Sequence, residues 1–107
     1  MTKIQAHEVR KSKHREHIAE LCRRYNVKRM AIFGSAATGG LSDTSDIDIA
    51  VVFDRTGFEG SFDQYMGLKE ELEQLYGRPV DLVTADKIRN AVFAQEVEKT
   101  QEVIYAA

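Results

Sequence analysis

Two aspartates stand two residues apart at the start of an apolar run, and this spacing constrains the fold more than any other feature. The run is Asp46-Ile47-Asp48-Ile49-Ala50-Val51-Val52-Phe53, which is typical of a β-strand. Residues i and i+2 of a strand share a face, so Asp46 and Asp48 project side by side. The opposite, buried face is predicted to comprise Ile47, Ile49, Val51 and Phe53. Adjacent carboxylates repel each other unless a cation or proton lies between them, which favours a hard dication such as Mg²⁺.

A small-residue turn lies ten residues before these acids. Gly34 and Ser35 follow a predicted strand over residues 28–33. Glycine lets the backbone approach a ligand closely, and the amide groups that open a following helix can bind phosphate. Each motif alone is weak, but together they indicate phosphoryl or nucleotidyl transfer. The chain contains neither G-x-x-x-x-G-K-[ST] nor G-x-G-x-x-G, which disfavours a P-loop ATPase and a dinucleotide-binding oxidoreductase.

A third acid, Asp81, interrupts the apolar predicted strand over residues 80–84. If this strand lies beside that of Asp46 and Asp48, the three carboxylates meet. They could then hold two divalent ions about 3.5–4 Å apart, the spacing used for in-line displacement at phosphorus. The alternative is an acid at the start of a strand that faces solvent after the turn at Gly77 and Pro79.

Helices are predicted over residues 13–25, from Ser35 to Thr38, from Ser61 to Gly77, and from a cap at Asp86 through a stretch that includes Ile88. Residues 102–105 could form a last short strand or a helix end. This order of elements predicts an α/β (α+β) fold, in which helices pack on a small mixed β-sheet.

The 107 residues predict one domain, spanning 1–107. The single Cys22 excludes an intramolecular disulfide, and its place on the apolar face of helix 13–25 favours a core residue over a nucleophile. No signal peptide or membrane span is evident, so we expect a cytoplasmic protein without a membrane partner. Residues 1–29 carry nine Lys and Arg against three Glu. This basic region could bind RNA or could be the solvated side of a helix.

The joint motif Gly34-Ser35, Asp46-x-Asp48 and Asp81 within Arg78-Pro79-Val80-Asp81-Leu82-Val83 resembles the DNA polymerase β-like nucleotidyltransferase superfamily. The resemblance covers about residues 28–105 and is greatest to the minimal branch, the MNT proteins, commonly antitoxins of HEPN–MNT toxin–antitoxin pairs. It implies the polymerase β-like nucleotidyltransferase fold in a single minimal domain.

The resemblance also implies roles for these residues. Asp46 and Asp48 would bind two Mg²⁺ ions, Asp81 would bind the catalytic one, and Gly34 and Ser35 would hold the nucleoside triphosphate. The implied reaction is transfer of AMP from ATP to a hydroxyl with release of pyrophosphate. In antitoxin members the acceptor is a tyrosine of the partner HEPN ribonuclease toxin.

Thr38 departs from the family, whose members often have Arg at this position of the turn. Threonine supplies no positive charge to phosphate. The short chain also leaves no room for a lobe that grips base or acceptor, so a partner chain or a second copy, as in a homo-oligomer, would have to complete the cleft. Two alternatives stay open: a nucleotidyltransferase acting on a small-molecule or RNA hydroxyl, and a non-catalytic antitoxin that acts by binding.

Overall fold

The computed structural model describes residues 15–34, 37, 46–54 and 61–107. The first elements are α2 (Arg15–Arg24), β1 (Val27–Phe33), β2 (Ile47–Phe53) and α4 (Ser61–Tyr76). They are followed by β3 (Val80–Thr84), the short 3₁₀ helix η2 (Ala85–Lys87), α5 (Ala91–Thr100) and β4 (Glu102–Ala106). The strands form one sheet in the order β3-β2-β1-β4, with β2 and β3 parallel and the other pairs antiparallel. The predicted small mixed sheet with helices packed on it is confirmed.

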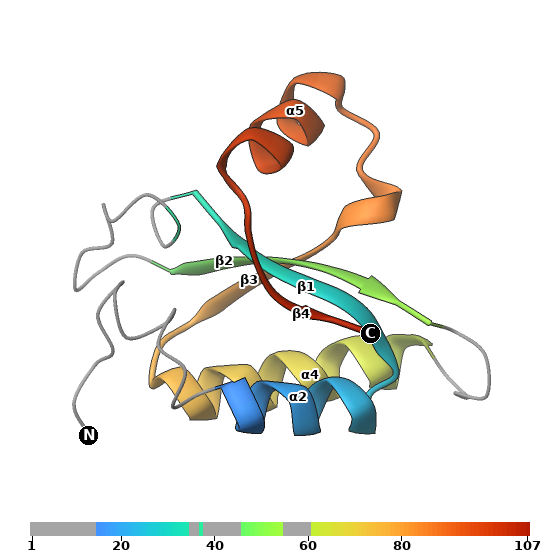
Figure 1. Cartoon of the computed structure of the whole chain (residues 1–107), viewed down its shortest axis with the longest axis vertical. Helices are drawn as coiled ribbons and strands as arrows, with labels where there is room; N and C mark the ends of the chain where they lie inside the picture. Colours follow the sequence, from blue (N-terminus) through green and yellow to red (C-terminus); the bar gives the residue numbers. More distant parts are fainter. Residues whose placement is uncertain (1–14, 35–36, 38–45, 55–60) are drawn as a thin grey trace.

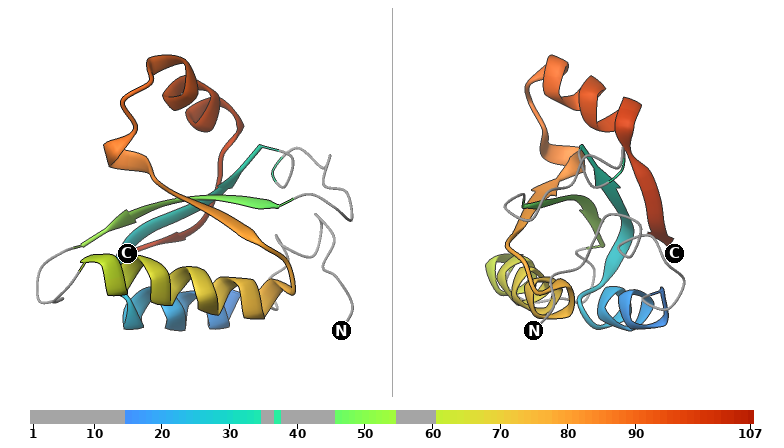
Figure 2. Two further views of the ribbon diagram at one scale, coloured as in Figure 1. Left: turned by 180° about the vertical axis from the view of Figure 1, so that it is seen from behind. Right: turned by 90° about the vertical axis from the view of Figure 1, so that its left-hand side faces the viewer.

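Helices lie on both faces of this sheet. Helices α2 and α4 run side by side beneath one face, whereas α5 lies over the other (Figures 1 and 2). The main core fills the space between the sheet and the helix pair, and burial of each large aliphatic side chain there contributes about 1.5–3 kcal/mol. Its members include Ile18, Leu21 and Cys22 of α2, Leu68, Leu72 and Tyr76 of α4, and the predicted inner face of β2, Ile47, Ile49, Val51 and Phe53.

The face of the sheet under α5 carries a smaller apolar cluster. Phe33, Ala50 and Val97 are buried there, and Val97 is the buried residue of α5. Side chains alternate along a strand, so Asp48 shares this face with Ala50, and Asp81 shares it with Val83. The acidic residues therefore lie on the α5 side of the sheet, away from the main core.

Helix α4 fixes the edge strand β3 on both sides of Asp81. The backbone N–H of Val80 donates to Oε2 of Glu73 at 2.9 Å, and the hydroxyl of Tyr65 donates to the carbonyl of Leu82 at 2.6 Å. These bonds satisfy edge groups that have no strand partner on that side. The strand that carries Asp81 is thereby held in place from outside the sheet.

The predicted start of the last helix, at Asp86, is wrong. Residues Ala85–Lys87 form only a 3₁₀ turn, and Ile88 lies outside the helix, against the small apolar cluster. The N-cap of α5 is Asn90, whose side-chain oxygen accepts a hydrogen bond from the Phe93 N–H at 3.0 Å. Because Ile88 packs under α5, the helix begins only after Asn90, the next residue that favours an N-cap.

The other predicted elements are found with small shifts. Residues 102–105, left open between strand and helix end, belong to β4. Helix α2 occupies Arg15–Arg24 of the predicted 13–25, and residues 13 and 14 lie outside the described part. Of the helix predicted from Ser35 to Thr38, only Ala37 is described, and it is helical.

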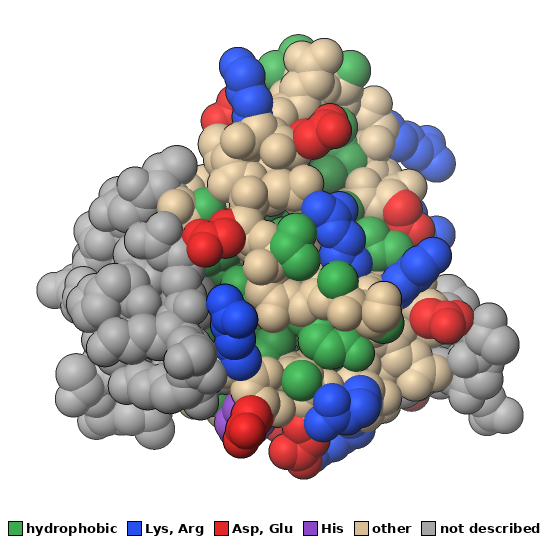
Figure 3. Space-filling view, viewed as in Figure 1, with side chains coloured by type: hydrophobic (Ala, Val, Ile, Leu, Met, Phe, Trp, Pro, Cys, Tyr) green, Lys and Arg blue, Asp and Glu red, His purple; other side chains and the backbone are tan. Residues whose placement is uncertain are grey.

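The surface near α2 carries charges of both signs. Arg24 forms ion pairs with Glu20 at 3.1 Å and with Glu71 at 3.7 Å. The described part of the face in Figure 3 mixes Lys and Arg with Asp and Glu side chains. For the described part of the basic region, these pairs favour the solvated face of a helix over an RNA-binding surface. None of the described helices combines the length and apolarity that a membrane span requires.

Candidate active site

Three strands bring the predicted site residues to one end of the sheet. The parallel register of β2 and β3 places Asp48 opposite Asp81, and the antiparallel register of β1 and β2 places Phe33, the residue before Gly34, opposite Asp48. Neighbouring strands lie about 4.8 Å apart, so the two acids are adjacent. Asp46 immediately precedes β2. The prediction that the strand of Asp81 lies beside that of Asp46 and Asp48 is confirmed.

The three carboxylates differ in their environment. Asp48 is half-buried, whereas Asp46 and Asp81 are exposed. Burial raises the pKa of the Asp48 carboxyl above its ordinary value, and the negative charges of Asp81 and then Asp46 raise it further. The carboxyl at the centre of the site is therefore surrounded by like charge, which a bound cation would relieve.

Gly34 brings the turn after β1 into contact with this carboxyl. Its φ of 62° lies in the left-handed region that favours glycine. A Cβ atom at this position would lie 2.7 Å from Oδ2 of Asp48. The backbone conformation thus favours glycine, and a side chain here would also displace the Asp48 carboxylate from its position. Ser35 and Thr38 lie outside the described residues.

The Gly34 turn is also held from the far end of the chain. The Gly34 N–H donates to Oγ1 of Thr100 at 3.2 Å, across 66 residues of sequence. No local pattern predicts this contact, because Thr100 is an ordinary helix-terminal residue and belongs to no motif.

The three acids do not form a ready-made metal site in this structure. Across the described ranges, no three Asp, Glu, His or Cys side chains are already grouped as a metal site. The donor set nevertheless suits Mg²⁺, because carboxylate oxygens are the ligands of hard cations and the charges of Asp81 and Asp46 both act on Asp48.

Cys22 takes no part in this site. It is a fully buried member of the main core, and burial raises the pKa of its thiol to about 12. A thiol with that pKa is not a nucleophile at neutral pH, which confirms the predicted core role.

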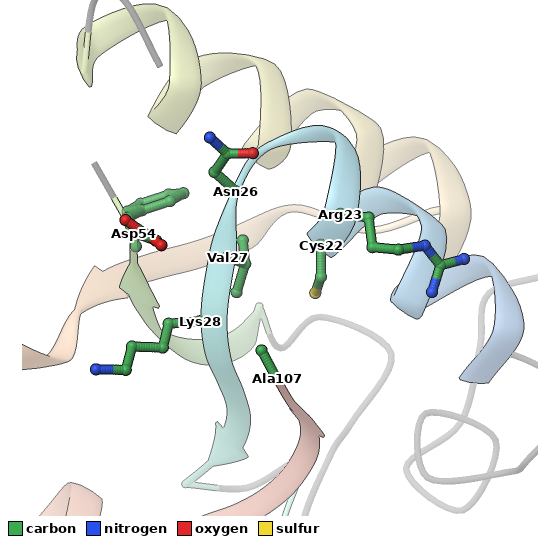
Figure 4. A pocket seen from close by; sticks show the side chains of 8 residues that line it. Cys22, Arg23, Asn26, Val27, Lys28, Asp54 and Ala107 are labelled. Atoms are coloured by element: carbon green, nitrogen blue, oxygen red, sulfur yellow. The ribbon is translucent and has the colours of Figure 1, made fainter. Parts of the chain in front are cut away.

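A hollow lies at the opposite end of β1. It measures about 710 Å³ and is lined by residues that include Cys22, Val27, Lys28 and Asp54 (Figure 4). Val27 pairs with Phe53, whereas Asp48 pairs with Phe33, so the hollow is roughly 20 Å along the strands from the acids. Of the three hollows described, none has Asp46, Asp48 or Asp81 in its lining.

Comparison with known proteins identifies the family. Residues 16–107 match the family profile described as polymerase beta, nucleotidyltransferase. The chain belongs to the polymerase β nucleotidyltransferase family. The resemblance predicted from the motifs is therefore confirmed, and the chain is an enzyme of the nucleotidyltransferase type.

Individual members of this nucleotidyltransferase family are similar over most of the chain. A candidate protein adenylyltransferase of Methanocaldococcus jannaschii is 41% identical over 91 residues, which cover 85% of this chain and 88% of the relative. A solved candidate minimal nucleotidyltransferase superposes with a TM-score of 0.77 at 26% identity, over 95% of this chain and 98% of its own.

A second similar structure is a complex of a tri-AMPylated Shewanella oneidensis HEPN toxin with an MNT antitoxin. The matched chain has a TM-score of 0.61 at 22% identity, over 89% of this chain and 71% of that chain. At this identity the likeness shows a shared fold.

Proposed function

We propose that this nucleotidyltransferase transfers AMP from ATP to a tyrosine hydroxyl of a HEPN-type ribonuclease and thereby acts as its antitoxin. The observation that carries the proposal is the placement of Asp48 beside Asp81 and against the Gly34 turn. In this arrangement the acids that would bind metal lie next to the turn that would bind phosphate. Further support comes from the M. jannaschii relative, named for protein adenylylation, and from the AMPylated HEPN toxin bound by an MNT antitoxin of the same fold.

In this proposal the three acids hold two Mg²⁺ ions, Asp46 and Asp48 binding both and Asp81 the catalytic one. When bound, Mg²⁺ supplies the positive charge that stabilises the triphosphate and the leaving pyrophosphate and that acidifies the attacking hydroxyl. Gly34 and Ser35 hold the triphosphate through the turn and the hydroxyl of Ser35. Asp81 accepts the proton of the acceptor hydroxyl.

The step balances without a further reactant. The acceptor oxygen forms a bond to the α-phosphorus of ATP, and the bond from that phosphorus to the bridging oxygen breaks. Pyrophosphate leaves with the electron pair, and the acceptor proton passes to the Asp81 carboxylate. The product is the AMP ester of the acceptor hydroxyl.

A partner chain is proposed to complete the cleft. Asp46 and Asp81 are exposed to solvent rather than enclosed. The isolated chain should therefore bind ATP weakly and with little selectivity for the base, because the wall for base and acceptor comes from the partner. A second copy of this chain is the alternative source of that wall.

The proposal is tested with ATP labelled at the α-phosphate, Mg²⁺ and the HEPN partner. The expected result is label on the partner, which disappears when the partner's tyrosines are replaced by phenylalanine. Absence of transfer by the wild type, under conditions in which the partner binds, would exclude the catalytic role. Label on added RNA or a metabolite without the partner would instead assign another acceptor.

Thr38 favours a second candidate, an antitoxin that acts by occlusion alone. Threonine in place of the usual arginine removes a positive charge from the turn. The double variant Asp46→Asn, Asp48→Asn separates the two mechanisms. Full neutralisation of the toxin by this variant would support occlusion, whereas loss of neutralisation with retained complex formation supports catalysis.

A further inference from the structure

We infer that Thr100 is a positioning residue for the reaction and holds the Gly34 turn in register with the acids. The inference deepens the proposed function, since it rests on the assignment of triphosphate binding to that turn. Thr100 lies at the last position of α5 and is half-buried.

Strand register explains why the side chain of Thr100 meets the turn. In the antiparallel pairing of β1 with β4, Ile32 lies opposite Glu102. Continuing this register by two residues would bring Gly34 opposite Thr100, but the backbone of Thr100 belongs to α5. The Thr100 hydroxyl therefore stands where a strand carbonyl would stand and accepts the Gly34 N–H at 3.2 Å.

The orientation of this hydroxyl is fixed by its own helix. Oγ1 of Thr100 donates its proton to the carbonyl of Glu96 at 2.9 Å. The oxygen lone pairs are then left to accept from Gly34. Valine has the same shape but can make neither bond, whereas serine can make both.

A second contact ties α5 to the same segment. The ring of Phe93 meets that of Phe33, the residue before Gly34, edge to face with centroids 5.9 Å apart. Helix α5 rests on the sheet through a small cluster with Val97 as its buried member. Because α5 contacts both Phe33 and Gly34, the conformation of the turn depends on the position of the helix.

Loss of the Thr100 hydroxyl should loosen the turn without moving the acids. Asp48 and Asp81 are placed by the β2–β3 pairing and by α4, neither of which involves Thr100. The expected effect is a rise in KM for ATP of about three- to tenfold, the size associated with one neutral hydrogen bond. The value of kcat should change less than twofold.

The experiment compares wild type with Thr100→Val and Thr100→Ser in the full chain. The matched control is Thr84→Val, a half-buried threonine at the end of β3 whose side chain makes no capping hydrogen bond. Two quantities are measured: hydrogen exchange of the Gly34 amide by NMR without nucleotide, and KM and kcat for AMP transfer. Thr100→Val should speed exchange of the Gly34 amide at least about tenfold and raise KM, whereas Thr100→Ser and Thr84→Val should resemble wild type.

Each outcome supports or overturns the inference. Unchanged exchange in Thr100→Val would show that the hydroxyl does not hold the turn. Faster exchange with an unchanged KM would show that the turn is held but that its position does not matter for nucleotide. If the wild type transfers no AMP, the proposed function fails, and Gly34 exchange together with the affinity for Mg²⁺-ATP from titration still decides the inference.

Discussion

Replacing Gly34 by alanine tests whether the turn after β1, which we propose to bind phosphate, forms one unit with Asp48. Two separate effects are expected. The φ of 62° places alanine in the left-handed region, at a cost of about 1–2 kcal/mol. The new Cβ would also lie 2.7 Å from Oδ2 of Asp48, where an ordinary contact is about 3.5 Å.

The second effect should fall on activity rather than on stability. The clashing atom is the end of a side chain, so the carboxylate can swing away at little cost in free energy of unfolding. To reach ordinary contact it must move by roughly 0.8 Å. A displacement of about 1 Å at a catalytic group can lower the rate about 100-fold, and we expect a loss of that order in AMP transfer.

Thermal unfolding and AMP transfer measured on the same samples separate the two effects. For a chain of this size each kcal/mol lowers Tm by about 4–8 °C, so the backbone strain alone should lower Tm by at least that much. Gly77→Ala is the matched control, because Gly77 has a φ of 66° and lies just after α4, outside the acidic site. It should show a similar loss of Tm with unchanged AMP transfer.

AMP transfer by Gly34→Ala at nearly the wild-type rate would contradict the prediction. Such a result would mean that Asp48 does not need the position in which the turn meets it. An equal loss of activity in both variants would point to general destabilisation rather than to contact with the acid.

Three further predictions follow from the structure. Asp48→Asn should abolish AMP transfer; in chemical unfolding without metal it should be more stable than wild type at pH 7, with the gain shrinking towards pH 4. The sign follows from the raised pKa of Asp48, which favours the protonated folded form, so wild type loses this contribution as pH rises through that pKa. The Cys22 thiol, whose pKa burial raises to about 12, should react with a disulfide reagent at pH 8 only after unfolding; rapid labelling of folded chain would contradict its burial. Tyr65→Phe removes the hydrogen bond to the Leu82 carbonyl and should lower the free energy of unfolding by about 1 kcal/mol, whereas an unchanged value would show that water replaces it.

Local patterns in the sequence were sufficient to predict the sheet and the acids. The alternation in β2 separates the core-facing residues from Asp46 and Asp48, and an acid inside an apolar strand marks Asp81. The adjacency of Asp48 and Asp81 required one further assumption, that β2 and β3 pair. This pairing is confirmed.

Features that depend on tertiary contacts could not be predicted from the sequence. Asp86 and Asn90 are both residue types that favour a helix N-cap. The packing of Ile88 against the small apolar cluster of Phe33, Ala50 and Val97 explains why α5 begins after Asn90. The contact of Thr100 with Gly34 depends on the β1–β4 register and on the place where α5 ends, neither of which has a local signal. The predicted roles of Ser35 and Thr38 stay predictions, because both residues lie outside the described part of the chain.

The proposed function requires this nucleotidyltransferase to silence a HEPN partner by chemistry at the three acids. Its most direct test is the intact mass of the partner after incubation with ATP, Mg²⁺ and either wild type or Asp81→Asn, read together with the partner's ribonuclease activity. Wild type should add one or more AMP groups and silence the ribonuclease, whereas Asp81→Asn should bind the partner, leave its mass unchanged and leave it active. An unmodified partner that wild type and Asp81→Asn silence equally would show that binding alone, without AMP transfer, silences the ribonuclease.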